Sequence, residues 1–120
     1  MNENMTLEKK LKTILDFNES IRFAGLLLSD GTLESFIQKP GLVTLLDKDE
    51  SKKSYLHAVL RATNYKAMDS KLGKSIWTIT LRQKIKWLTV YLNIGMIILS
   101  TEINSDHNKI LKNVFKVFDI

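Results

Sequence analysis

The sequence predicts an α+β domain with the element order α-β-β-α-β-β-β-α, and three observations support this class. Apolar residues recur at helical spacing near both ends of the chain and in its middle. An Asp30-Gly31 pair separates two apolar runs, which is a strong hairpin signal. Three consecutive strand-like segments lie in the C-terminal half. The length of 120 residues predicts one domain spanning residues 1–120.

The N-terminal third predicts a helix followed by a β-hairpin. Thr6 is a suitable N-cap, and the apolar stripe that follows it consists of Leu7, Leu11, Ile14 and Leu15. The first strand, Ile21 to Leu28, ends in three consecutive leucines. We therefore expect both of its faces to be covered and the strand to be central. The second strand runs from Leu33 to Gln38 and ends before Pro40-Gly41.

The middle of the chain predicts one long helix from about Lys48 to Leu72. Asp47 and Glu50 have the spacing of a capping box at its start. Gly73 fits the left-handed position that ends such a helix. We expect one apolar stripe to face the core, formed by Leu56, Val59, Leu60, Thr63 and Ala67.

Three strands and a closing helix follow. The strands are expected at Ser75 to Arg82, Ile85 to Leu92 and Gly95 to Ile103. A two-residue turn at Gln83-Lys84 sets a register that joins apolar residues on one face, pairing Trp77 with Val90 and Ile79 with Leu88. The opposite face then holds Thr78, Thr80, Ile85, Trp87, Thr89 and Tyr91. Ser105 or Asp106 caps the last helix, whose apolar stripe is Ile110, Leu111, Val114, Val117 and Phe118.

The residue types exclude several chemistries. The chain has no cysteine, and its five glycines are too far apart for a Walker or Rossmann phosphate loop. Asp47, Asp49 and Glu50 fit helix capping better than a calcium loop, which needs a central glycine and further oxygen ligands. His57 and His107 have no second histidine or carboxylate at helical spacing. We therefore expect no metal, no cofactor and no enzymatic activity.

The net charge of +5 comes from 18 Lys and Arg against 13 Asp and Glu, and the lysines are scattered over the predicted helices. This pattern is typical of solvated faces and disfavours nucleic acid as a partner. Arg82, Lys84 and Lys86 cluster at one predicted turn, where they could bind an anion or simply form a charged hairpin tip that protects an edge strand from aggregation.

The first five residues have no signal-peptide character, and Leu88 to Leu99 is too short to cross a bilayer. We expect a cytoplasmic protein with no membrane partner.

Two groups of side chains are candidates for a protein interface. Trp87 and Tyr91, on the threonine-rich sheet face, could form a binding patch, since aromatic residues dominate interface hot spots. The alternative is that a helix covers them. Small and aromatic residues on a flank of the long helix could meet a second copy of the chain, or could be scattered surface residues. These flank residues are Tyr55, Ala62 and Tyr65.

The order of the elements resembles the roadblock family, within the profilin-like and longin-like group of folds. The hairpin from Ala24 to Thr32 is similar to that family's opening strand, turn and second strand. Leu72-Gly73-Lys74, the meander after it and Asp106-His107 also look like a group of small archaeal proteins, mainly from ammonia-oxidising lineages. The resemblance covers nearly the whole chain, and none of its motifs is catalytic.

This resemblance implies a five-stranded antiparallel sheet with the long helix on one face and the terminal helices on the other. Roadblock proteins commonly dimerise through the long helix and the adjoining strand edge. They serve as scaffolds or regulators, often for small GTPases. The implied function is a non-enzymatic interaction module whose partner is a second copy or a small GTPase. The alternative is a small-ligand sensor of PAS type, which a single long helix disfavours because PAS domains usually divide that section into several short helices.

Overall fold

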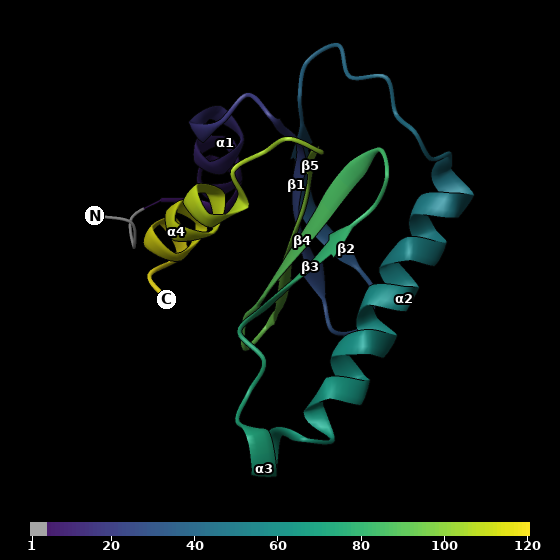
Figure 1. Ribbon diagram of the computed structural model, residues 1–120, viewed down its shortest axis with the longest axis vertical. Coiled ribbons are helices and arrows are strands. Elements are labelled where there is room, and N and C mark those ends of the chain that lie inside the picture. The colour runs from purple at the N-terminus through teal and green to yellow at the C-terminus, as the bar shows by residue number, and fades with distance from the viewer. Residues whose placement is uncertain (1–4) are drawn as a thin grey trace.

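Five antiparallel strands form one sheet in the order β2-β1-β5-β4-β3. The computed structural model describes residues 5–120. Helices α1 and α4 lie on one face of the sheet and α2 lies on the other (Figure 1). The elements are α1 (Leu7–Phe17), β1 (Ile21–Leu28), β2 (Leu33–Gln38), α2 (Lys48–Lys66), α3 (Asp69–Leu72), β3 (Trp77–Leu81), β4 (Ile85–Tyr91), β5 (Gly95–Glu102) and α4 (His107–Phe118). The predicted fold class is confirmed, with α3 as one added short helix.

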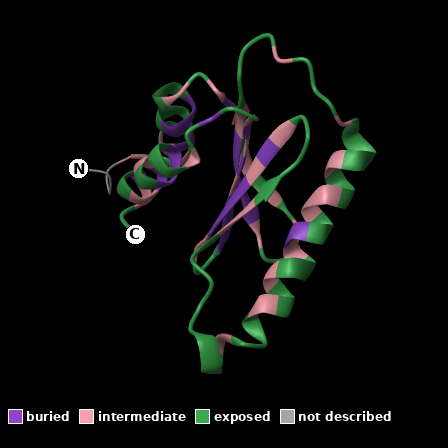
Figure 2. Ribbon diagram, in the orientation of Figure 1, coloured by how far each residue is buried: buried purple, intermediate pink, exposed green. Residues whose placement is uncertain are grey.

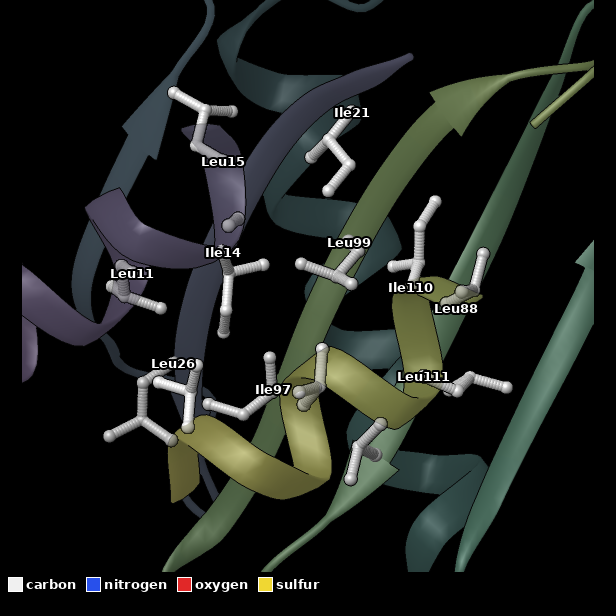
Figure 3. Packing of buried hydrophobic residues seen from close by; sticks show 14 residues of the cluster. Leu11, Ile14, Leu15, Ile21, Leu26, Leu88, Ile97, Leu99, Ile110 and Leu111 are labelled. Atoms are coloured by element: carbon white, nitrogen blue, oxygen red, sulfur yellow. The ribbon is translucent and has the colours of Figure 1, made fainter. Parts of the chain in front are cut away.

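The main core lies between the sheet and the two terminal helices, whose predicted apolar stripes supply it (Figure 3). The Thr6 side chain accepts a hydrogen bond from the Lys9 backbone N–H, which confirms the predicted cap of α1. Asp106, not Ser105, caps α4, by accepting from the Lys109 N–H. The buried members of this core are Leu11, Ile14, Leu15, Ile21, Ala24, Leu26, Leu88, Val90, Ile97, Leu99, Ile110, Leu111, Val114 and Val117.

Both predicted hairpins are present. Gly31 has φ of 91° in the β1–β2 turn, a conformation that favours glycine. Asp30 Oδ1 accepts a hydrogen bond of 2.8 Å from the Thr32 N–H, which lowers the pKa of the Asp30 carboxyl. The predicted β3–β4 register is confirmed, because Trp77 pairs with Val90 and the two-residue turn closes with an Arg82 N–H bond to the Ile85 carbonyl. β1 pairs with both β2 and β5, so it is an interior strand as predicted.

The long helix differs from the prediction in length. Its capping box is confirmed, since Asp47 and Glu50 each accept a hydrogen bond from the other's backbone N–H. The helix ends at Lys66 instead of Leu72. Residues 66–68 are exposed, so burial does not stabilise a further helical turn there. The short α3 follows, and Gly73 ends it with φ of 81°.

Of the stripe predicted to face the core from α2, Val59 does pack toward the sheet, but the prediction is wrong for its other members, which are exposed: Leu56, Leu60, Thr63 and Ala67. Ala58 is the one buried residue of this helix, which is otherwise half-buried or exposed along its length (Figure 2). Half-buried Tyr55, Val59 and Ala62 pack beside Ala58 onto Leu27 and Met96 of the sheet. The small Ala58 side chain lets the helix approach the strands. At 3.6 residues per turn, positions two residues before and after Ala58 lie about 200° around the helix from it. The leucines at these positions, Leu56 and Leu60, therefore lie on the side of the helix away from the sheet, and the Leu56 side chain also lies near Gly31 of the β1–β2 turn.

Candidate functional site

The side of α2 that faces away from the sheet carries a row of exposed apolar and small side chains. Leu56 is 55% exposed and Leu60 is 59% exposed. Thr63 and Ala67, also exposed, continue the row along the helix axis. Charged or polar residues normally occupy the solvent face of a helix. These four residues, the outer stripe of α2, are a surface that the described chain leaves uncovered.

Strand β3 is a second uncovered feature. Within residues 5–120 it hydrogen-bonds with β4 alone, so the N–H and C=O groups of its other edge have no ladder partner. None of its five residues is charged. Trp77 at one end is 39% exposed and Leu81 at the other is 68% exposed. Edge strands without charges, prolines or covering segments readily pair with another strand.

The three flank residues of α2 in the sequence-based hypothesis lie between the helix and the sheet. Tyr55 and Ala62 pack against the small cluster that contains Leu27 and Met96. The Tyr65 ring meets the Tyr91 ring edge to face, with 6.3 Å between centroids and 87° between planes. The premise that these residues occupy a free flank is therefore wrong. Burial raises the pKa of the Tyr55 hydroxyl.

Tyr91 and Trp87 have different surroundings although both face α2. Tyr91 is covered by Tyr65, and its hydroxyl lies 3.4 Å from the Thr78 hydroxyl. Trp87 is half-buried and forms a wall of a cleft beside α2. The Arg82 guanidinium lies over the Trp87 ring, 5.2 Å from its centroid. Trp87 thus keeps part of its surface available, whereas Tyr91 belongs to the packing of α2.

The three basic residues grouped by sequence separate in space. Arg82 and Lys84 are exposed at the β3–β4 turn. Lys86 is buried: its Nζ donates a 2.8 Å hydrogen bond to the Ser105 carbonyl and lies 3.2 Å from His107 Nδ1. It therefore lies on the α4 side and cannot bind an anion together with the other two.

Two connected depressions lie beside α2. The inner cleft has a volume of about 180 Å³ and lies between α2, the sheet and loop 39–47, with Tyr55, Ala58 and Trp87 among its walls. The outer hollow has a volume of about 810 Å³ and lies between α2 and the β3–β4 turn. The two share the wall residues Leu45, Leu46, Ser54, Arg61, Ile85 and Trp87. Together they form one continuous depression.

Residues 5–120 contain no group of three or more His, Asp or Glu side chains placed to hold a metal ion. None of the helices in this part of the chain is long and apolar enough to cross a membrane.

Sequence reasoning missed the depression beside α2 and the exposure of the outer stripe. The depression is assembled from residues 45–61 and 80–87, so no contiguous motif marks it. One usable signal was the spacing of His57 and Arg61 at i and i+4, which places both on one flank of α2. The structure places that flank next to the turn that holds Arg82 and Lys84.

Solved structures identify the fold. No family model matches the chain, and no curated protein matches it by sequence. The chain has the fold of the Roadblock/LC7 domain: such a domain from Streptomyces avermitilis has a TM-score of 0.75 at 11% identity, over 96% of this chain and 93% of that chain. This likeness confirms the predicted roadblock fold. The comparisons do not support the resemblance to archaeal proteins.

MglB is the particular protein that recurs among these structures. The gliding protein MglB from Thermus thermophilus has a TM-score of 0.77 at 10% identity, over 92% of this chain and 81% of that chain. MglB from Myxococcus xanthus has a TM-score of 0.72 at 8% identity, over 96% of this chain and 93% of that chain. At these identities the likeness establishes the fold and no activity.

Proposed function

We propose that this chain is a cytoplasmic, non-enzymatic interaction module that works as a homodimer. The observation that carries the proposal is the outer stripe of α2, on which Leu56 and Leu60 each expose more than half of their surface. A second copy that covers this stripe removes apolar surface from water, the main driving force of association.

A symmetric contact is the simplest way to cover the stripe. In a two-fold dimer the same patch of each protomer meets its own copy. The outer stripe would then meet the partner's outer stripe, helix against helix. Pairing of the open β3 edge with the partner's β3 is a different two-fold contact, because it would extend the sheet and place the two α2 helices side by side on one face instead of outer stripe against outer stripe. An uncharged edge of Trp77–Leu81 suits such pairing because no like charges oppose each other within it.

The proposed work of the dimer is to bind and regulate a small GTPase. The roadblock resemblance motivates this class of partner. The chain itself has no glycine-rich phosphate loop, so nucleotide chemistry would belong to the partner. One of the similar structures is described as MglB with a tetrameric arrangement, which is an assembly of that protein.

Light scattering after size exclusion tests the dimer, over protein concentrations from the nanomolar to the high micromolar range. The expected mass is twice that of one chain at micromolar concentration. A strict monomer throughout that range contradicts the proposal. The GTPase step is tested by mixing the chain with purified small GTPases of the same genome and measuring GTP hydrolysis and nucleotide exchange. Unchanged rates with every such GTPase contradict that part.

The inner cleft favours a second candidate, a small-ligand sensor of PAS-like type. The cleft has walls of mixed polarity, with apolar Ala58 beside the Ser54 and Thr89 hydroxyls. The unbroken α2 of 19 residues is an argument against it. A thermal-shift screen with metabolites tests this candidate, which requires at least one compound to raise the melting temperature.

A further inference from the structure

The outer hollow beside α2 is cationic. Its charged walls are Arg61 from α2 and Arg82 and Lys84 from the β3–β4 turn, with His57 next to them. Among the described residues that line it, none is acidic. No carboxylate within residues 5–120 forms an ion pair with any of these three cations. Three like charges therefore surround one hollow without compensation from the described part of the chain.

One of these cations is held in place by an aromatic ring. The Arg82 guanidinium lies 5.2 Å from the centroid of Trp87, which is a cation–π contact. This contact restricts the Arg82 side chain while leaving its N–H groups able to donate to a carboxylate. Trp87 also lines the inner cleft, so its ring is a wall shared by the cationic outer hollow and the inner cleft.

The inner cleft lies at the end of the hollow and has apolar walls beside the hydroxyl groups of Ser54 and Thr89. Its volume of about 180 Å³ is too small for a folded element and suits a single aliphatic or aromatic side chain. Ala58 and Ile98 contribute apolar walls, and Trp87 closes the side nearest the hollow. The depression therefore combines three cations around the outer hollow with a small, largely apolar cleft behind them.

We propose that this depression binds an acidic segment of a partner protein, with one apolar side chain of that segment inserted into the inner cleft. The proposal rests on the proposed function as an interaction module, but it uses the flank of α2 and not the outer stripe. Carboxylates of the segment pair with Arg61, Arg82 and Lys84, and the apolar anchor supplies burial. Charge complementarity of this kind steers association and selects the partner.

Two other occupants fit the same surface less well. A second copy of the chain carries a net charge of +5, and a symmetric contact through the hollow would bring like charges together. Nucleic acid would match the cations, yet single strands are held by several aromatic stacking platforms. Here one aromatic ring, Trp87, stands among the aliphatic walls Leu45, Leu46 and Ile85. An acidic peptide uses both the charges and the aliphatic walls.

The test measures fluorescence anisotropy of short labelled probes with the full chain. The first probe is a fluorescein-labelled peptide in which Asp and Glu residues flank one central leucine. The second replaces the leucine with serine, the third replaces every acid with lysine, and the fourth is a single-stranded oligothymidylate. We expect binding of the first probe, weakened at least several-fold when salt rises from about 0.05 M to about 0.5 M. The second and third probes should bind at least about tenfold more weakly.

Matched variants locate the binding site. The double substitution Arg61→Glu and Arg82→Glu reverses two charges of the hollow and should weaken binding of the first probe about tenfold or more. Lys109→Glu with Lys112→Glu makes the same change in net charge on exposed positions of α4, across the sheet, and should leave binding unchanged. Circular dichroism checks that each variant is folded. Should the first pair fail to fold, Lys84→Glu in the exposed turn replaces it, with a smaller loss expected.

Four results would overturn the proposal. The first is that the first probe does not bind. The second is an equal loss of affinity for that probe in both variant pairs, and the third is no loss of affinity in the Arg61→Glu/Arg82→Glu variant. The fourth is tighter binding of the oligothymidylate than of the acidic peptide. The last would instead indicate a nucleic-acid site. Light scattering on the same samples separates this proposal from the homodimer. If the chain is a dimer that does not bind the peptide, only the proposed peptide site is refuted. If the chain is a monomer that binds the peptide, only the proposed homodimer is refuted.

Discussion

Replacing the two leucines of the outer stripe should separate the dimer without unfolding the chain. The perturbation is Leu56→Ser together with Leu60→Ser. Full burial of a leucine side chain contributes about 1.5–3 kcal/mol. These side chains are 55% and 59% exposed, so covering the remainder contributes about half of that for each. A symmetric dimer contains each leucine twice, which brings the total to about 3–6 kcal/mol.

The assay is sedimentation velocity over a range of protein concentrations. At about 1.4 kcal/mol per tenfold change, the loss should raise the dimer Kd by a factor of about a hundred to about ten thousand. Because both leucines are already exposed in the protomer, the stability of an isolated protomer should change by about 0.5 kcal/mol or less. Val43→Ser with Ile94→Ser is the matched control, since these side chains are 80% and 62% exposed and lie outside α2 and β3. A Leu56/Leu60 variant that dimerises as tightly as the wild type refutes the reasoning.

Three further substitutions test two features of the fold and the half-buried hydroxyl of Tyr55. Asp47→Ala removes the cap of α2 and should lower the free energy of unfolding by about 1 kcal/mol in a denaturant titration. Gly95→Ala places a Cβ against the Leu27 carbonyl oxygen, well inside van der Waals contact, so chemical denaturation should show a loss of about 1–3 kcal/mol. Tyr55→Phe should remove a tyrosinate absorbance component that titrates above the ordinary tyrosine pKa of about 10. Because the folded-state pKa of Tyr55 is raised, its contribution to stability is complete below the unfolded pKa and is lost as the pH rises through the folded pKa.

The terminal helices were predictable because each has one apolar face. In α1 and α4 the large apolar residues fall on a single stripe, and that stripe meets the sheet. Helix α2 has two apolar faces, one containing Ala58 and the other containing Leu56 and Leu60. Periodicity favours the larger leucines, whereas close approach to a sheet favours the small alanine. A single sequence does not distinguish the face that meets its own sheet from the face left for a partner.

The candidate site was predictable only in part, for a different reason. Arg82 and Lys84 were correctly placed at an exposed turn, whereas Lys86 was grouped with them by sequence proximity alone. Lys86 is the second residue of β4, and its buried side chain reaches Ser105 at the start of the α4 region. The long aliphatic stem of a lysine can be buried in this way when its ammonium finds a carbonyl. The cationic neighbour of Arg82 that sequence proximity could not reveal is Arg61, 21 positions earlier in the chain.

The unequal covering of the two sheet faces has a consequence for motion. Releasing α2 from the sheet uncovers few buried side chains, chiefly Ala58 on the helix and Leu27 and Met96 below it, whereas releasing α1 or α4 opens the main core. Local opening is cheapest where the fewest apolar contacts are lost. Backbone amides of α2 should therefore exchange with deuterium sooner than those of the terminal helices. Any molecule that covers either side of α2 must slow that exchange, so deuterium uptake along one helix would report binding before the partner is identified.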